Sequence, residues 1–289
     1  MTPEIEAKLA RLIPLAPLHQ PWGLTGLRLT ADTCPGVPQV ASFDTAFHRG
    51  MSPVTTRYAL PRQFEAEGVR RYGFHGLSYA YVSARLRELD PKAASGRVIV
   101  AHLGGGASLC AIHDGRSVDT TMGFSTLDGL VMATRPGAVD PGVLLHLIQA
   151  RGMTADEMSD LLYHRSGLLG VSGISGDMRA LLASVEPAAR DAIDLYVHRI
   201  VREIGALSAV MGGLEGLVFT GGVGENAAQI RAAVCDRLRW LRVMLGDQPG
   251  DGARQISAVG SLPVWVIPTD EERVLALEAI EAISAEPAQ

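Results

Sequence analysis

The feature that most constrains the fold is a set of three strand-forming segments between residues 97 and 121, separated only by short glycine-containing turns. Residues 97–103 (RVIVAHL) and 107–113 (ASLCAIH) flank three consecutive glycines, and Asp114-Gly115 separates the second segment from residues 116–121. Apolar runs bounded by turn residues are typical of buried strands, and Asp-Gly favours a hairpin turn. We therefore predict a three-stranded meander whose glycine turn leaves room for phosphate oxygens beside backbone N–H groups.

Helices and strands alternate after this meander. Helical patterns run over 141–151, 154–163 and 187–212, and a short buried strand over 217–220 leads into a glycine-rich loop before a helix that begins near Ala227. A strand over 263–267 precedes a final helix. This order predicts one complete α/β domain from about residue 93 onward. Before it, the sequence predicts helices over 4–13 and 76–89 and, over 38–47, a buried strand that runs into a polar turn.

The composition excludes several classes of protein. Hydrophobic residues make up 47% of the 289-residue chain, charged residues 20%, and the net charge is -5. A nucleic-acid binder would instead show a basic excess, so we expect no nucleic-acid partner. No apolar run approaches the roughly 20 residues that cross a bilayer, so we expect no membrane partner. The three widely spaced cysteines argue against a disulfide framework and favour the reducing cytoplasm.

Two glycine-rich segments are candidate phosphate sites. One is the turn 104–106, and the other is residues 221–226 (GGVGEN), which follow a predicted strand and precede a helix. Glycines allow close backbone approach, and a helix N-terminus presents unpaired amides to an anion. The spacing matches neither the dinucleotide fingerprint nor the P-loop. Taken alone, each segment is equally consistent with a tight structural turn.

Three polar side chains are candidate catalytic groups. Asp44 lies in FDTAFH, where it is either a base or orienting group for an attacking oxygen, or a helix N-cap. His75 lies between glycine and aromatic residues in YGFHG. Arg135 lies in a Gly/Pro loop, either solvated or placed to stabilise the equatorial oxygens of a phosphoryl group in transfer.

Eight segments in this order carry a family resemblance: FDTAFH, YGFHG, HLGGGASL, DGRSVDTTMGF, LDGLVMATRPG, SGLLGVSGISGDMR, FTGGVGEN and IPTDEE. Together they resemble the acetate kinase family, which belongs to the larger sugar kinase/Hsp70/actin group. The resemblance covers essentially the whole chain. It implies an α/β, duplicated ribonuclease H-like fold, an activity that transfers phosphate between ATP and acetate or another short carboxylate, Mg²⁺ (alternatively Mn²⁺) as the metal, and a homodimer.

The resemblance also implies a role for each matching position. Asp44, His75 and Arg135 are catalytic, Phe74 lines the acyl pocket and Glu271 is associated with the metal. The nucleotide-binding positions fall in three segments, which are His102, Leu103, Gly104, Gly105 and Gly106; Asp177, Met178 and Arg179; and Gly222, Val223, Gly224, Glu225 and Asn226.

The chain departs from the family pattern in two ways. A strand ending in a motif like N-A-G-S-S-S-x-K is absent. We therefore expect residues 1–92 to be a remnant of an N-terminal domain truncated at its start, and residues 93–289 to be the nucleotide-binding domain. We expect the C-terminal helix to pack back on the N-terminal remnant. Gly105 stands where asparagine is common. The alternatives to an active kinase are an inactive homologue that binds nucleotide or dimerises, and one half of a split enzyme.

Overall fold

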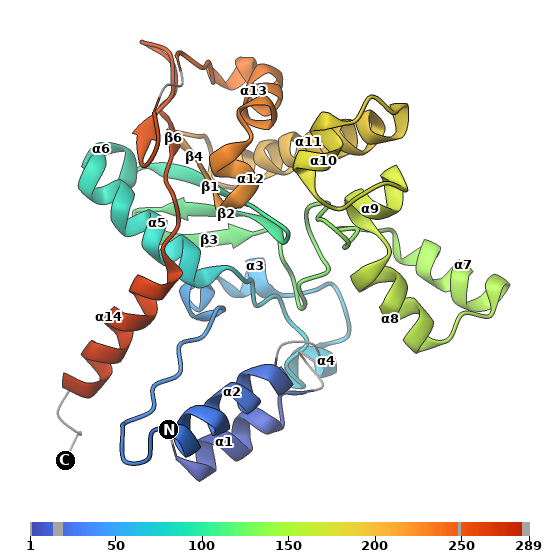
Figure 1. The fold of residues 1–289 in the computed structure, drawn as a ribbon, viewed down its shortest axis with the longest axis vertical. Coiled ribbons are helices and arrows are strands. Elements are labelled where there is room, and N and C mark those ends of the chain that lie inside the picture. The colour runs from blue at the N-terminus through green and yellow to red at the C-terminus, as the bar shows by residue number, and fades with distance from the viewer. Residues whose placement is uncertain (1, 14–19, 248–249, 285–289) are drawn as a thin grey trace.

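The centre of the fold is a six-stranded mixed sheet (Figure 1). The computed structural model describes residues 2–13, 20–247 and 250–284. The sheet has the order β3-β2-β1-β4-β6-β5. Its strands are β1 (Arg97–Leu103), β2 (Ala107–His113), β3 (Arg116–Thr120), β4 (Gly216–Thr220), β5 (Arg254–Gln255) and β6 (Val264–Val266).

The strand pairing confirms the predicted meander. β1, β2 and β3 are antiparallel neighbours, whereas β4 is parallel to β1 and β6 is parallel to β4. The carboxyl ends of β1, β4 and β6 therefore lie at one edge of the sheet. In open α/β sheets, ligands bind outside this edge. The short strand β5, antiparallel to β6, was not predicted.

Both faces of the sheet are covered by helices, and β1 shows why. Ile99 and Leu103 belong to a core that includes α11 (Pro187–Val210), whereas Val98 and Val100 belong to a second core that includes α5 (Gly76–Leu89). Successive side chains of a strand point to opposite faces, so a run of apolar residues is buried on both sides. Burial of each large apolar side chain contributes about 1.5–3 kcal/mol.

The other helices surround this core. Before the sheet come α1 (Pro3–Ala10), α2 (Gln20–Thr33), η2 (Ala46–His48), α3 (Pro53–Thr56), α4 (Arg62–Ala66) and α6 (Pro91–Ala94). After it come α7 (Pro141–Arg151), α8 (Ala155–His164), α9 (Gly167–Ser172), α10 (Met178–Ala183), α12 (Gly221–Asn226), α13 (Ala228–Arg237), η3 (Arg239–Leu241) and α14 (Glu271–Ser284). In Figure 1, α1 and α2 lie away from the sheet, while α14 runs down from the N-terminal end of α5. The helix α14 packs against α5.

Two predictions about local structure are wrong. Residues 38–47 do not form a buried strand: they run without regular structure into turns and η2, and Phe43 is 47% exposed. A strand needs a neighbour to pair its backbone groups, and among the described residues before Arg97 there is none. Residues 221–226 are not an open loop but the short helix α12, which α13 follows directly. The domain boundary at residue 92 stays a prediction, and α5 on its N-terminal side packs on the sheet.

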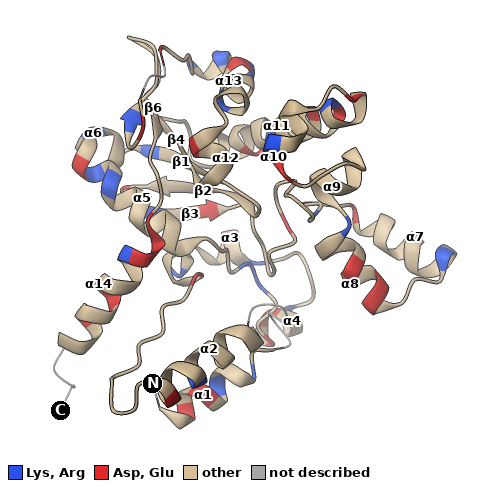
Figure 2. Ribbon diagram, viewed as in Figure 1, with Lys and Arg blue, Asp and Glu red and all other residues tan. Residues whose placement is uncertain are grey.

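The distribution of charge agrees with the mixed composition. Acidic and basic residues are interspersed along helices such as α5 and α13 rather than gathered by sign (Figure 2). In the part of the chain that the structure describes, no helix is both long and apolar enough to span a membrane.

Candidate active site

The glycine turn between β1 and β2 is where the predicted catalytic groups meet. A Cβ atom on Gly106 would lie 2.7 Å from Nη2 of Arg135 and 3.2 Å from Nε2 of His75. The two side chains, 60 residues apart in sequence, therefore converge on the same backbone position. Only glycine allows this close approach. A guanidinium and an imidazole directed at one point can stabilise negative charge that develops there.

Arg135 is held by the loop that carries it and by its own side chain. At the start of α9, Leu168 N–H donates to Met132 O at 2.8 Å and Leu169 N–H donates to Ala133 O at 2.9 Å. Nη1 of Arg135 donates to Thr126 O at 2.9 Å. Partial burial lowers the pKa of Arg135. The guanidinium nevertheless stays charged, because an arginine does not deprotonate at physiological pH.

His75 sits at the N-cap of α5 with a left-handed backbone, φ 58°. This conformation is uncommon outside glycine and persists where surrounding contacts enforce it. Nδ1 of His75 lies 2.8 Å from Ser108 Oγ, and its ring stacks on that of His102 with centroids 4.2 Å apart. Nδ1 of His102 lies 2.8 Å from Ser78 Oγ. Burial and the adjacent His75 lower the pKa of His102 to about 3, so this ring is neutral at physiological pH.

Asp44 binds the start of α5 and lies near a second carboxylate. Its Oδ2 accepts from His75 N–H at 2.7 Å, and its backbone oxygen accepts from Gly76 N–H at 2.7 Å. Asp44 is therefore not a helix N-cap: Thr45 is the N-cap of η2 and His75 that of α5, and the Asp44 carboxylate binds the backbone N–H of His75. Glu271, the first residue of α14, has a pKa raised by burial and by the charge of Asp44. Two carboxylates that repel each other favour a bound cation.

This pair suits a magnesium ion better than a metal held by protein alone. Among the residues that the structure describes, no group of three His, Cys, Asp or Glu side chains could hold a metal ion. Magnesium is usually bound by one or two carboxylates together with substrate phosphates and water. Asp44 and Glu271 would supply those carboxylates.

A pocket of about 510 Å³ adjoins the glycine turn and collects most of the predicted nucleotide-binding residues. Its lining includes Gly104, Gly105, Asp177, Met178, Arg179, Gly222, Val223 and Asn226. They come from the β1–β2 turn, the start of α10 and helix α12. Arg179 forms an ion pair of 2.6 Å with Asp177 at the pocket rim. Predicted positions from three distant segments thus lie around one cavity.

The other predicted positions have different surroundings. Leu103 and Gly224 are buried, and His102 stacks on His75. The Glu225 carboxylate accepts from the N–H groups of Gly221 at 2.8 Å and Thr269 at 3.2 Å, which joins the end of β4 to the segment after β6. The role of Phe74 stays a prediction; its side chain packs against the core and its carbonyl oxygen lies 3.0 Å from His48 Nε2.

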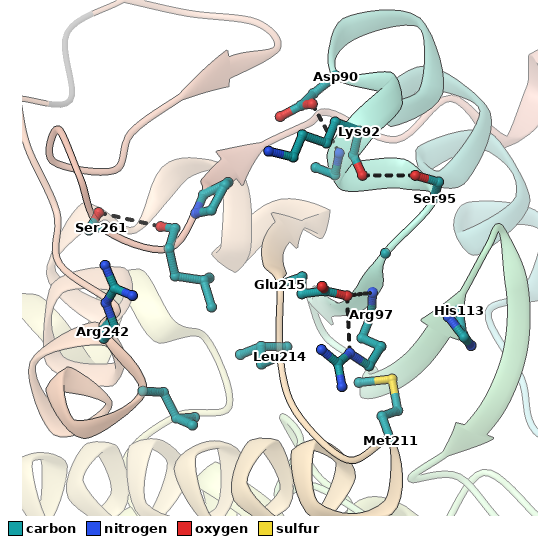
Figure 3. Close-up of a pocket in the computed structure, with 15 residues that line it drawn as sticks. Asp90, Lys92, Ser95, Arg97, His113, Met211, Leu214, Glu215, Arg242 and Ser261 are labelled. Carbon is teal, nitrogen blue, oxygen red and sulfur yellow. Dashed lines mark hydrogen bonds and ion pairs between the residues drawn. The ribbon is translucent and has the colours of Figure 1, made fainter.

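A larger pocket, of about 880 Å³, lies at the opposite edge of the sheet (Figure 3). Its central feature is the ion pair between Arg97 and Glu215 at 3.0 Å, which ties the start of β1 to the residue before β4. Lys92 and Arg242 lie on separate sides of it (Figure 3). None of the predicted site residues lines this pocket, so its size does not make it the candidate active site.

Sequence reasoning missed the residues that support the two histidines, namely Ser78, Tyr79 and Ser108. Two signals could have found them. Ser78 and Tyr79 follow His75 by three and four residues, the spacing that places side chains on one face of a helix. Ser108 lies directly opposite His102 in the predicted hairpin, where the side chains of facing residues are neighbours.

The fold and the site together define a class. A sheet of this order with a glycine turn at its carboxyl edge, an adjoining pocket and two converging nitrogen groups fits a kinase of the actin and sugar-kinase-like fold. Comparison with known proteins agrees. The chain is 42% identical to the Porphyromonas gingivalis acetate kinase crystal structure, with a TM-score of 0.91 over 98% of this chain and 74% of that one. A propionate kinase from Francisella tularensis is 38% identical, with a TM-score of 0.91 over 96% and 73%.

Sequence relatives identify the family. The model of the acetokinase family matches residues 1–277. Acetate kinase of Rhodopseudomonas palustris is 53% identical over 281 residues, which cover 96% of this chain and 71% of that protein. Acetate kinase of Rickettsia akari is 46% identical over 96% of this chain and 73% of that protein. The chain therefore belongs to the acetokinase family.

Proposed function

We propose that this protein catalyses phosphoryl transfer between ATP and acetate, which gives ADP and acetyl phosphate. The observation that carries the proposal is the convergence of Arg135 Nη2 and His75 Nε2 on Gly106, beside the 510 Å³ pocket. Curated relatives of this family are named acetate kinases. One structural relative is titled a propionate kinase, so the acyl group is to be tested with both carboxylates.

The chemistry needs alignment and charge stabilisation more than acid–base catalysis. An oxygen of the ionised acetate forms a bond to the γ-phosphorus as the bond to the leaving ADP oxygen breaks, and no proton has to be removed from the nucleophile. Negative charge on the phosphoryl oxygens then lies next to Arg135 and His75, whose N–H groups stabilise it. Asp44 holds the backbone of His75 and orients the reacting groups.

The pocket supplies the nucleotide site in this proposal. Backbone N–H groups of the glycine turn and of α12 face the phosphates, while Asp177, Met178 and Arg179 lie beside the adenosine. Enzymes of the acetokinase family use ATP or ADP together with Mg²⁺. When bound, the metal would neutralise phosphate charge. In this chain Asp44 and Glu271 would hold it.

The test is hydroxamate formation from acetate, ATP and Mg²⁺ by the purified chain. We expect Arg135→Ala to lower kcat at least about a hundredfold, because loss of one oxyanion donor costs 10²–10³. Arg151→Ala, an exposed arginine at the end of α7, is the matched control and should keep full activity. Equal rates for wild type and Arg135→Ala would refute the proposed role of Arg135.

A second candidate function is nucleotide binding without turnover by this chain alone. It is favoured by the 510 Å³ pocket, because the predicted nucleotide-binding residues line one cavity whether or not phosphoryl transfer follows. Calorimetry with MgADP separates the two. Binding together with hydroxamate formation supports the kinase, and binding without it supports nucleotide binding alone.

We also propose that the protein forms a homodimer through its C-terminal part. Apolar side chains are exposed on α14, among them Leu277 and Ile280. Single apolar residues on a surface are ordinary, whereas several on one helix favour an interface. Light scattering at micromolar concentration should give twice the mass of the chain, and the mass of one chain would refute the proposal.

A further inference from the structure

A buried chain of hydrogen bonds lies behind His75, on the side away from the glycine turn. Ser108, the second residue of β2, places its Oγ 2.8 Å from His75 Nδ1. The same oxygen is hydrogen-bonded to the hydroxyl of Tyr79, one helical turn after His75 in α5. Tyr79 and Ser108 both have 0% exposure. Water therefore cannot replace either side chain in this series of hydrogen bonds.

The direction of these hydrogen bonds follows from the number of protons available. Burial raises the pKa of Tyr79 well above its usual 10, so the phenol keeps its proton. Among the described residues, Ser108 Oγ is the one hydrogen-bond partner of this phenol. A buried hydroxyl proton without an acceptor is costly, so Tyr79 donates to Ser108. The single proton of Ser108 is then directed to its other partner, Nδ1 of His75.

We infer that Tyr79 and Ser108 are positioning residues that hold neutral His75 in the tautomer protonated on Nε2. This inference rests on the proposed function for its catalytic consequence. Nε2 is the ring nitrogen near Gly106, where Arg135 also arrives. The relay therefore supplies a hydrogen-bond donor to the phosphoryl site from an uncharged imidazole. The other tautomer would present a lone pair there, which would repel phosphoryl oxygens.

The surroundings of His75 favour this neutral donor. Among the residues that the structure describes, the charged and titratable groups beside it include Arg135, the ring of His102, the carboxylate of Asp44 and Tyr79. The guanidinium of Arg135 disfavours a second positive charge at the same point. His102, against which His75 stacks, is itself neutral. A fixed tautomer thus provides the donor without a second cation next to Arg135.

The direct test is the tautomer itself, read by long-range ¹H–¹⁵N NMR on the full chain with ¹⁵N-labelled histidine. The His75 signals are assigned by their loss in His75→Gln. At pH 7.5 we expect wild-type His75 to carry its proton on Nε2. In Tyr79→Phe the Ser108 hydroxyl is free to rotate, and in Ser108→Ala the donor is gone, so both should populate the Nδ1–H form. Tyr81→Phe, on the same helix, is the control and should leave the tautomer unchanged.

The consequence for activity is a loss of kcat without a matching change in KM. In Tyr79→Phe and Ser108→Ala we expect kcat to fall about tenfold, less than loss of a whole donor because the correct tautomer is still partly populated. The KM for ATP should stay within about twofold, since the nucleotide pocket is untouched.

Two results would overturn the inference: an Nδ1–H tautomer in the wild type, or variants whose His75 signals match those of the wild type. The NMR readout needs no turnover, so it tests the relay even if the chain proves inactive and the proposed function fails. Tyr79→Phe is nearly isosteric, which keeps the test available if Ser108→Ala does not fold.

Discussion

Substitution of Gly106 by alanine should separate catalysis from stability in this protein. The new methyl group would lie 2.7 Å from Arg135 Nη2, whereas ordinary contact begins at about 3.4 Å. The guanidinium must therefore retreat by about 0.7 Å. His75 Nε2, at 3.2 Å, must yield by a few tenths of an ångström. Gly106 does not have a left-handed backbone, so alanine adds no backbone strain.

The retreat should be inexpensive for folding and costly for catalysis. Both clashing atoms are at the ends of side chains, and Arg135 keeps its bond to Thr126 O while its other nitrogen moves. We expect a loss of about 1 kcal/mol in unfolding free energy, or roughly 2–4 °C in Tm for a chain of this size. A displacement of this order at a reacting centre costs up to about 10²-fold. We therefore expect kcat to fall between ten- and a hundredfold, about 1.4–2.7 kcal/mol of transition-state stabilisation.

The assay is hydroxamate formation, with Tm from scanning calorimetry. The control is Gly50→Ala, because no heavy atom lies within 4 Å of a Cβ built there and Gly50 does not line the nucleotide pocket. It should keep wild-type kcat and Tm. Wild-type kcat in Gly106→Ala, or an equal loss in Gly50→Ala, would refute the argument that Arg135 and His75 act at this point.

Three further predictions follow from the same region. The turn has open space for an asparagine side chain at position 105, so we expect Gly105→Asn to leave Tm unchanged. Its amide adds a hydrogen-bond donor for phosphate, so calorimetry should give a lower Kd for MgADP. A higher Kd would contradict this prediction. Lowering the pH from 7.5 to 5.5 should reduce the unfolding free energy by about 1.4 kcal/mol through His102. The pKa of His102 is about 3 in the folded state and 6.5 in the unfolded state. The unfolded state therefore binds the proton first, and stability falls as the pH falls through 6.5. Urea titrations of wild type and His102→Gln measure this, and an equal pH dependence would exclude it. Glu225→Ala should lose about 2 kcal/mol in urea, because it leaves the N–H groups of Gly221 and Thr269 unpaired; a loss under about 0.5 kcal/mol would contradict the bridge.

Much of the fold was predictable because local patterns and tertiary packing agree. Periodicity predicted a helix over 76–89, and α5 has those bounds; the apolar runs at 97–103 and 107–113 became β1 and β2. Residues 38–47 show where local reasoning fails. Their apolar content resembles that of a strand, but a strand forms only when a neighbour pairs its backbone groups, and no local signal reveals whether that neighbour exists.

The candidate site divides in the same way. Glycine-rich segments beside strands are visible in the sequence, and the structure brings most of their residues to one pocket. The meeting of His75 and Arg135 could not be derived from spacing, because it depends on how α5 and the loop before α7 both reach the β1–β2 turn. The resemblance named these two residues without giving their contact. Ser108 and Tyr79 were missed because neither a serine in a strand nor a tyrosine in a helix is unusual until its buried partner is known.

The start of α5 links the two halves of the site. Nε2 of His75 lies at the glycine turn together with Nη2 of Arg135. The backbone N–H of His75 donates to the Asp44 carboxylate. The charge of Asp44 in turn raises the pKa of Glu271. The start of α5 therefore lies between the Arg135 guanidinium, with the neutral His75 donor beside it, and the two carboxylates. A nucleotide phosphate would be attracted by the guanidinium but repelled by Asp44 and Glu271, whereas a metal ion would be attracted by those carboxylates. A metal–nucleotide complex would satisfy both sides of the site, so we expect it to bind more tightly than free nucleotide.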